Sequence, residues 1–460
     1  MTALSAWLDP RACPAERPPL VAMATETRTL HDALDAHARR TGLPYLHPDE
    51  PTVQLDLLGS AQTIAWQEGK AAFLFASEGC WSELPHLYAR YGTTATARLI
   101  TAVKALEQAG AVLTCDSGMQ ATALVFDVLM TPGSHAVLMR QVYNKTRSYL
   151  QWLAERVGGA ITIVDDGDDA ALAGAIRPET RVVFAETFTN PLVRAQDVTR
   201  LVATVRAART VAPDLRLIID STIATPWAFR RPLLAQGVDL VLASGTKALS
   251  GSDRDLWGYV ATNDTPTANA VMDVMAMRGG ILDWRRAEAI LAGLDQVEAA
   301  HARRSTTARR VAEFLSSHPK VSEVFHPSLP SHPDAAVIAA HYVRHGSLLS
   351  FRVAGADEDG ARHVADVLAT CIVVRYALSF DGLATKVNHH QTVSEYFTPK
   401  DQLRRNGFDR LIRLAIGIED VDDLIAALNW TLHHADRITA DEVAAWQEAR
   451  SRSLAGAPLP

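Results

Sequence analysis

The feature that most constrains the fold is a pair of short apolar runs, each of which leads into a polar side chain. Residues 217–219 lead into Asp220, and residues 240–243 lead into the segment Ser244-Gly245-Thr246-Lys247. Short runs of leucine and β-branched residues, bounded by turn formers, are typical of strands buried on both faces of a parallel sheet. Because ligands bind at the carboxyl ends of the strands in open α/β sheets, we expect Asp220 and Lys247 to face one pocket.

A lysine and a carboxylate in one pocket would suit pyridoxal phosphate. The amine of Lys247 can form an imine with the aldehyde of this cofactor, and Asp220 can keep its pyridine nitrogen protonated so that the ring accepts electrons. Opposite charges a few ångströms apart favour the ionised form of both groups. The hydroxyls of Ser244 and Thr246 can donate to the phosphate. A solvated loop residue is the alternative interpretation of Lys247 taken alone.

Three segments in a fixed order resemble the Cys/Met-metabolism family of PLP enzymes, which includes cystathionine γ-synthase, cystathionine lyases, methionine γ-lyase and homoserine-ester sulfhydrylases. The segments are residues 186–191 (ETFTNP), 220–222 (DST) and 244–247 (SGTK). The resemblance implies an α/β protein of fold type I (aspartate aminotransferase-like), with a mostly parallel seven-stranded sheet and a smaller α+β C-terminal domain. The expected division is an N-terminal arm (1–75), a large PLP-binding domain (76–300) and a small domain (301–460).

The same resemblance assigns further residues to the cofactor. A strand-to-helix turn would bind the phosphate through backbone N–H groups and the helix dipole, and this turn consists of Ser117, Gly118 and Met119. Tyr143 would stack on the pyridine ring and exclude water. Asn190 would hydrogen-bond the phenolic oxygen, and Thr222 belongs to the same cofactor site.

Tyr88 and Arg90 match a Tyr-x-Arg element that, in the family, reaches the cofactor phosphate of a neighbouring subunit. A planar guanidinium suits this role because it pairs bidentately with phosphate oxygens. The match implies a homo-oligomer, and we expect a dimer of dimers, that is, a homotetramer. A surface loop with an ordinary tyrosine and arginine is the alternative.

Two residues are assigned to the substrate. Arg413, near the start of the apolar run 411–418, would bind the α-carboxylate bidentately, and Ser379 lies in the family's substrate loop. The activity implied is γ-replacement or γ-elimination on an amino acid bearing a γ-leaving group, such as a homoserine ester, a thioether or a sulfonium. It would proceed through a Lys247 aldimine and a vinylglycine-type intermediate, with the freed lysine as general base. The alternatives are β-elimination from cystathionine or cysteine conjugates, and a non-catalytic paralogue.

The chain departs from the family pattern near the substrate. Residues 250–255 (SGSDRD) replace the usual Gly-His-Ser-Asp, and Arg254 and Asp255 could pair with each other or meet a polar substrate. Leu378 stands where the γ-enzymes commonly carry a glutamate, which puts recognition of the distal amino group of cystathionine in doubt. Lys145 stands where methionine γ-lyases carry a cysteine.

Composition excludes several classes of partner. A net charge of −7 gives no general attraction to nucleic acid or anionic membranes. The four cysteines are widely spaced without a CxxC pair, so neither a disulfide framework nor a zinc site is indicated. No uncharged apolar run reaches the ~18 residues of a membrane span, and the N-terminus lacks the apolar core of a signal peptide. We therefore expect a cytoplasmic enzyme with a small amino-acid substrate.

No metal site is expected. The acidic run 165–169 lacks the spacing of an EF-hand and is interpreted as a helix-capping loop. His389 and His390 are adjacent in sequence, so in a strand their side chains would point to opposite faces, and we interpret them as a surface pair.

Apolar periodicity and turn residues predict the main elements. Helices are expected at residues 29–40, 97–109, 122–129, 201–208, 232–236 and 287–311, with a closing helix that begins at 420–430. Strands are expected at 110–115, 136–139, 160–164, 181–185, 217–220, 240–243, 346–353 (opening the C-terminal domain), 371–374 and about 411–418. Residues 1–20 and 451–460 are expected to be disordered.

Overall fold

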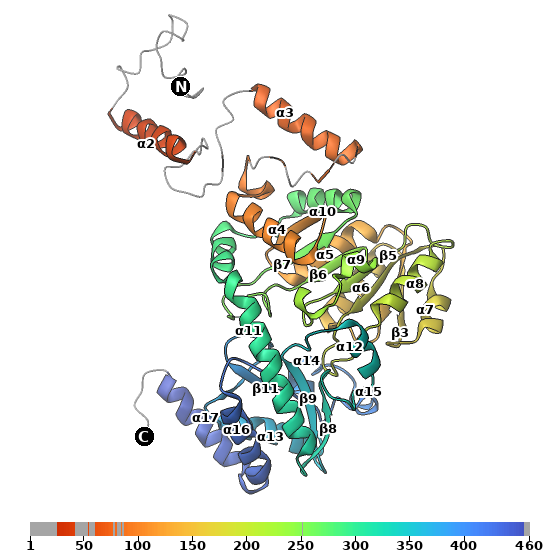
Figure 1. Cartoon of the computed structure of the whole chain (residues 1–460), viewed down its shortest axis with the longest axis vertical. Coiled ribbons are helices and arrows are strands. Elements are labelled where there is room, and N and C mark those ends of the chain that lie inside the picture. The colour runs from red at the N-terminus through yellow and green to blue at the C-terminus, as the bar shows by residue number, and fades with distance from the viewer. Residues whose placement is uncertain are drawn as a thin grey trace, which may run out of the picture.

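The computed structural model describes residues 25–41, 54, 60–76, 79–80, 84, 87–250 and 252–454. These residues form two sheets with separate hydrophobic cores, connected by one long helix (Figure 1). The expectations for residues 1–20 and 455–460 lie outside the described part of the chain. The disorder predicted from residue 451 is wrong for residues 451–454, because they form the last turn of α17 (Ala440–Leu454).

The larger sheet has seven strands, all parallel to their neighbours except β7, which is antiparallel to both β1 and β6. In spatial order the strands are β1 (Ala111–Cys115), β7 (Gly258–Thr262), β6 (Leu240–Ala243), β5 (Arg216–Asp220), β4 (Thr180–Glu186), β2 (His135–Met139) and β3 (Ala160–Val164). Residues 217–219 of β5 are fully buried, as the continuous apolar run requires. The predicted mostly parallel seven-stranded sheet is confirmed.

Helices connect these strands. They are α4 (Thr94–Glu107), α5 (Gly118–Leu129), α6 (Asn144–Arg156), α7 (Asp169–Ala175), α8 (Val198–Ala208), α9 (Leu233–Gln236) and α10 (Thr265–Arg278), with short turns η5 (Ala89–Tyr91) and η6 (Pro226–Ala228). Of these helices, α4, α5, α7, α8 and α10 begin at a serine, threonine or aspartate whose side chain caps the helix. The side chain of Asp168 accepts from the N–H of Ala171 at 2.9 Å and caps α7, so the acidic run is a capping loop as predicted. The N-terminal part contains α2 (Thr25–Thr41), α3 (Ser60–Ala71) and η3 (Ala72–Ala76).

The long helix α11 (Trp284–Ser317) runs from the large domain to the sheet of the C-terminal domain (Figure 1). That sheet has the order β10 (Val374–Tyr376), β11 (Thr385–His389), β12 (Ile412–Ala415), β9 (Leu348–Val353) and β8 (Val321–Phe325). Its helices are α12 (Ala335–His341), α13 (Glu358–Thr370), α14 (His390–Ser394), α15 (Lys400–Asn406), α16 (Val421–His434) and α17, with the turn η7 (Ala435–Arg437). The expected domain boundary at residue 300 falls within α11, which contributes buried residues to both cores.

Three predictions for the C-terminal domain are wrong. The strand at 346–353 does not open the sheet, because β8 precedes it along the chain. The strand predicted at 371–374 begins only at Val374, because a turn closed by the Val374 N–H and the Cys371 carbonyl follows α13. His389 and His390 are both buried, so they are not the predicted surface pair. The ring of His389 forms hydrogen bonds of 2.7 Å with the Thr392 hydroxyl and with the Asp409 carbonyl.

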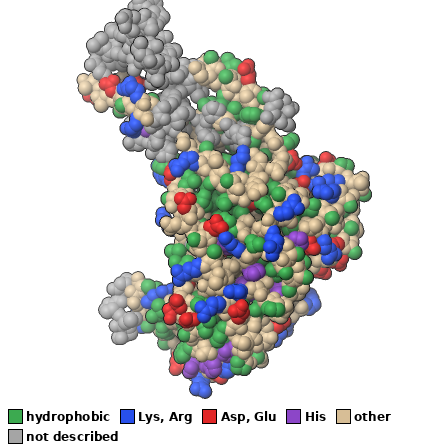
Figure 2. Space-filling model, in the orientation of Figure 1, with side chains coloured by type: hydrophobic (Ala, Val, Ile, Leu, Met, Phe, Trp, Pro, Cys, Tyr) green, Lys and Arg blue, Asp and Glu red, His purple; other side chains and the backbone are tan. Residues whose placement is uncertain are grey.

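The surface carries charges of both signs, and no two of the described cysteines form a disulfide. Figure 2 shows acidic and basic side chains interspersed on the face drawn. Among the described residues, every helix is too short or too polar to cross a lipid bilayer. Within the same residues, Cys80, Cys115 and Cys371 are free thiols, and no cluster of histidine, cysteine or carboxylate side chains could hold a metal ion.

Candidate active site

Asp220 and Lys247 follow neighbouring parallel strands of the large sheet. Asp220 ends β5 and lies in register with Leu242 of β6, and Lys247 follows β6 by four residues. Thr222 connects the two strand ends, because its N–H donates to the Asp220 carboxylate at 2.8 Å and its hydroxyl accepts from the Ser244 N–H at 2.9 Å. The structure therefore brings this part of the predicted site together.

The ammonium of Lys247 faces the loop of Ser379 and Phe380 in the C-terminal domain. Its Nζ donates to the Ser379 hydroxyl at 2.5 Å and lies 5.1 Å from the centre of the Phe380 ring. Burial lowers the pKa of Lys247, the nearby Asp381 carboxylate opposes this change, and the Lys386 ammonium adds to it. A lowered pKa leaves a larger neutral fraction of the amine near pH 7, as a general base requires.

A second carboxylate, Glu186, lies beside Asp220. Glu186 ends β4 in register with Asp220, and it accepts a 2.5 Å hydrogen bond from the backbone N–H of Tyr143. Burial raises the pKa of both carboxyl groups, and in Glu186 the charge of Asp220 raises it further. Sequence reasoning quoted Glu186 without giving it a role, although its place at the end of a strand was the available signal.

Arg413 lies on β12 and is 3% exposed. Its guanidinium donates to the side-chain oxygen of Asn190 at 3.1 Å and to the carbonyl of Leu378 at 3.0 Å, and it lies 5.8 Å from the Phe380 ring. Burial lowers the pKa of Arg413 to about 10, so the group remains a cation at neutral pH. Phe380, which sequence reasoning did not assign, thus contacts both the lysine and the arginine of the site.

The N-terminus of α5 lies against the segment that carries Lys247. The Ser117 hydroxyl caps this helix by accepting from the Gln120 N–H at 3.2 Å. A Cβ at Gly118 would lie 2.6 Å from the Cβ of Ser244, so only glycine permits this approach. The first backbone N–H groups of a helix, here those of Gly118 and Met119, have no acceptor within the helix and favour an anion.

One predicted phosphate donor, Thr246, is hydrogen-bonded to the protein backbone instead. The hydroxyl of Thr246 donates to the Trp257 carbonyl and accepts from the Trp257 N–H, both at 3.0 Å, which leaves Ser244 as the better hydroxyl donor for a phosphate. Tyr143 precedes α6 and is about half exposed.

Tyr88 and Arg90 lie on an exposed segment before α4. The guanidinium of Arg90 lies 5.5 Å from the Tyr88 ring and 5.4 Å from the Tyr91 ring, and it donates to the Ala276 carbonyl at 3.3 Å. Both predicted side chains are exposed, which a role across a subunit interface requires.

The unusual loop after Lys247 is held by Asp253. Its carboxylate accepts a 2.5 Å bond from the ammonium of Lys386, on β11. Within the described part of the chain, Arg254 and Asp255 do not form the ion pair that was one of their two predicted roles.

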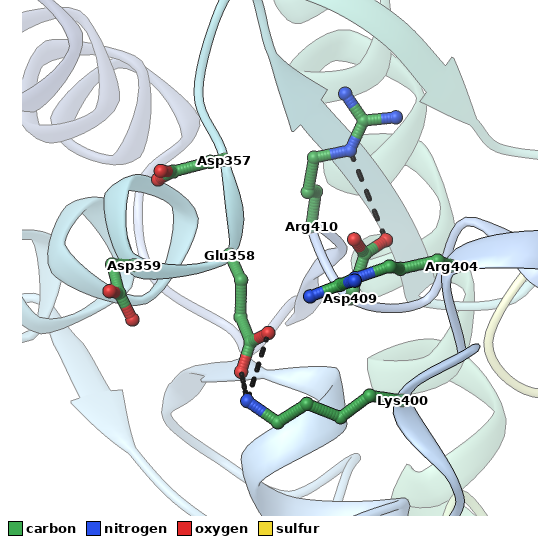
Figure 3. A pocket seen from close by; sticks show the side chains of 7 residues that line it. All are labelled: Asp357, Glu358, Asp359, Lys400, Arg404, Asp409 and Arg410. Atoms are coloured by element: carbon green, nitrogen blue, oxygen red, sulfur yellow. Dashed lines mark hydrogen bonds and ion pairs between the residues drawn. The ribbon is translucent and has the colours of Figure 1, made fainter. Parts of the chain in front are cut away.

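A separate cavity of about 320 Å³ lies in the C-terminal domain (Figure 3). Its charged lining groups largely neutralise one another, since Lys400 pairs with Glu358 at 3.3 Å and Arg410 with Asp409 at 3.9 Å. None of the predicted site residues lines it.

Pyridoxal phosphate fits the residues around Lys247. Burial outweighs the hydrogen bonds from Thr222 in setting the pKa of Asp220, so a cationic ring nitrogen would stabilise the ionised carboxylate. The N-terminus of α5 beside Ser244 would accept the phosphate. The Lys247 amine, whose pKa burial lowers, would form the imine.

Comparisons with known proteins agree with this fit. Residues 67–433 match the family model described as Cys/Met metabolism PLP-dependent enzyme. The cystathionine γ-synthase of Mycobacterium tuberculosis is 30% identical over 410 residues, which cover 89% of this chain and all of that protein. The cystathionine β-lyase MetC of Bacillus subtilis is 30% identical over 338 residues, 73% of this chain and 83% of that protein.

Among solved structures, the cystathionine γ-lyase of Lactobacillus plantarum, complexed with L-serine, superposes with a TM-score of 0.70 at 26% identity. The match covers 77% of this chain and 90% of that one. The chain therefore belongs to the Cys/Met-metabolism family of pyridoxal phosphate-dependent enzymes, and its chemistry is that of trans-sulfuration.

Proposed function

We propose that this enzyme catalyses γ-replacement or γ-elimination on an amino acid with a γ-leaving group: a homoserine ester, a thioether or a sulfonium. The observation that carries the proposal is the position of Phe380, whose ring lies 5.1 Å from the Lys247 ammonium and 5.8 Å from the Arg413 guanidinium. An α-amino acid can lie between these cations with its carboxylate on Arg413 and its Cα hydrogen toward Lys247. The match to a cystathionine γ-synthase over that protein's whole length favours a γ-reaction.

Each residue has a role in this proposal. Bound pyridoxal phosphate would supply an aldehyde carbon for the substrate amine and an electron sink for Cα. Asp220 would hold the ring nitrogen protonated. Arg413 orients the carboxylate, and Asn190 and the Leu378 carbonyl hold Arg413 in place.

Lys247 moves the protons. Its neutral amine would take the proton from Cα and deliver it to the former aldehyde carbon of the bound cofactor. Neutral again, the amine would take a proton from Cβ, after which the γ-substituent would depart with its bonding electrons. The Ser379 hydroxyl, at 2.5 Å, fixes the direction of the amine. Tyr143, positioned through its N–H by Glu186, would cover the ring and exclude water.

β-Elimination is the second candidate. The similarity to a cystathionine β-lyase supports it, and the same lysine, arginine and aspartate would serve, with the leaving group one carbon nearer to Cα. A non-catalytic paralogue is disfavoured because Lys247, Asp220 and Arg413 are all present and buried or half-buried.

We also propose a homo-oligomer, expected to be a dimer of dimers, in which Tyr88 and Arg90 complete the phosphate site of a neighbour. Their exposure supports this assignment. The cytoplasmic location stays a prediction.

The test begins with the cofactor and ends with the reaction. The purified protein should be yellow, borohydride should bleach it and leave the label on the Lys247 peptide, and Lys247→Ala should lack the colour. O-Acetylhomoserine, O-succinylhomoserine, cystathionine, methionine and S-adenosylmethionine are then compared by 2-oxo acid release and by mass spectrometry of products. Turnover of only β-substituted amino acids would reject the γ-reaction in favour of β-elimination.

A further inference from the structure

A buried ammonium group, that of Lys386, lies beside the active site and has no part in the roles above. Lys386 lies on β11 and is 8% exposed. A buried lysine ammonium is unfavourable unless it is paired and hydrogen-bonded. Its Nζ donates to the Asp253 carboxylate at 2.5 Å and to the backbone carbonyl of Asp381. The acceptors come from the two loops that flank the Lys247 amine.

The ion pair packs directly against the substrate loop. Asp381 and Gly382 have positive φ angles of 60° and 115°. A Cβ at Gly382 would lie 2.8 Å from the Lys386 Nζ and would collide with the Asp253 carboxylate. Glycine is therefore required at position 382 both for its φ angle and for the approach of the ion pair.

Two further contacts fix the same loop. The Ser347 hydroxyl donates to the Asp381 carboxylate. The fully buried guanidinium of Arg304 donates to the Gly382 carbonyl at 3.0 Å and to the Ala248 carbonyl, next to Lys247, at 3.5 Å. The loop that presents Ser379 is thus bonded to the segment that presents Lys247.

We propose that Lys386 is a positioning residue of the active site, which, paired with Asp253, holds the loop of Ser379 against the Lys247 amine. The inference rests on the proposed role of Lys247 as the base. It gives a function to the unusual loop after Lys247, whose Asp253 supplies the partner that a buried lysine on β11 requires.

Because Lys386 and Asp253 carry opposite charges, removing either one should change the protonation of the Lys247 amine in opposite directions. The charged groups that face the Lys247 amine are Asp381, Lys386, Arg413 and Asp253. Removing the Lys386 cation leaves the anions beside Lys247 and favours its protonated form. Removing the Asp253 anion leaves the Lys386 cation unbalanced and favours the neutral amine. A residue that serves only folding would not produce shifts of opposite sign.

The experiment titrates the full-length holoenzyme with pH and follows the visible absorbance of the cofactor, which reports protonation of the Lys247 nitrogen without any substrate. Lys386→Met should move the midpoint up and Asp253→Asn should move it down, each by roughly 0.5–1 pH unit, less than the 1–3 units of a direct contact. The double variant should return the midpoint to within about 0.3 unit of the wild-type value by this charge argument. Lys386→Arg, which keeps the charge, should also retain it.

Activity on the best substrate gives the second readout. Loss of the pair should lower kcat roughly tenfold, the effect of about 1.4 kcal/mol. KM should change little, because Arg413 is untouched. Lys400→Met, which removes the lysine of the exposed Lys400–Glu358 pair, is the matched control and should change neither quantity.

Shifts of the same sign in Lys386→Met and Asp253→Asn, or no shift in either, would overturn the inference. Because the titration needs only bound cofactor, this result is distinguishable from failure of the proposed reaction, which the substrate comparison detects by itself.

Discussion

Replacing Arg413 tests the substrate orientation most directly. The guanidinium has five N–H donors, and two of its nitrogens donate to Asn190 and to the Leu378 carbonyl. The remaining donors are available to a substrate carboxylate. Since Arg413 is 3% exposed, water replaces those bonds poorly in a variant. We therefore expect Arg413→Met to lose carboxylate binding and to retain the cofactor.

The magnitude follows from the bonds lost. Hydrogen bonds to charged groups contribute roughly 1.5–3 kcal/mol each, so loss of a bidentate pair costs roughly 3–6 kcal/mol. At about 1.4 kcal/mol per factor of ten, kcat/KM should fall roughly 10²- to 10⁴-fold in Arg413→Met. Arg413→Lys keeps a charge without the planar fork, so its loss should be roughly 10- to 100-fold.

The assay compares an amino-acid substrate with its carboxamide, which lacks the carboxylate. Arg413→Met should reduce kcat/KM for the acid far more than for the amide, whereas Arg404→Met, at an exposed arginine of the C-terminal domain, should reduce neither. Because burial lowers the pKa of Arg413 to about 10, the KM of the wild type for the acid should rise as the pH passes 10. Equal losses for acid and amide in Arg413→Met would refute the assigned role.

Three further predictions concern buried carboxyl groups and specificity. Asp220→Asn should weaken cofactor binding by roughly 3 kcal/mol, or 10²-fold, as an equilibrium titration would measure. The same variant should raise the melting temperature of the cofactor-free chain, because burial raises the pKa of this carboxyl group and disfavours its charge. Burial raises the pKa of Glu107, which accepts from the Tyr259 hydroxyl, from 4.5 to about 7. Between these pH values the folded chain binds more protons than the unfolded chain, so the free energy of unfolding should fall by up to about 3 kcal/mol as the pH rises through this interval. The midpoints of urea unfolding would show this fall in the wild type, and Glu107→Gln should lack it. Leu378→Glu should lower the KM for cystathionine, by at most about fivefold, since an exposed ion pair contributes about 1 kcal/mol or less. An unchanged KM would argue against contact between position 378 and the distal amino group of cystathionine.

The sequence predicts the large domain well because its signals are local. Buried parallel strands read as continuous apolar runs, and their carboxyl ends share one edge of the sheet, so Asp220 and Lys247 could be placed together without coordinates. The C-terminal domain was harder to predict. The half-exposed strand β8 has no continuous apolar run, and the apolar segment 371–373 is a turn.

The site shows the same division between local and long-range information. Glu186 could have been found, since it ends a predicted strand as Asp220 does. The contact of Phe380 with Lys247 and Arg413 could not, because it depends on how the two sheets lie relative to each other. The engagement of the Thr246 hydroxyl by Trp257 is likewise a contact between neighbouring segments, which no spacing in the sequence encodes.

Asp253, in the loop that departs from the family pattern after Lys247, and Lys386 on β11 are best understood together, because the burial of the partners is unequal. The Asp253 side chain is 48% exposed and would be solvated without a partner, whereas that of Lys386 is 10% exposed. Leaving one charge of a buried pair unpaired costs roughly 3–5 kcal/mol, so the lysine depends on the aspartate far more than the reverse. An acidic loop could therefore precede the lysine at no great cost in stability, but a lysine on β11 without that loop would be strongly unfavourable. On the proposal above, Asp253 is then a condition for placing a cation beside the Lys247 amine, and the proton transfer by Lys247 would depend on a contact between segments 133 residues apart.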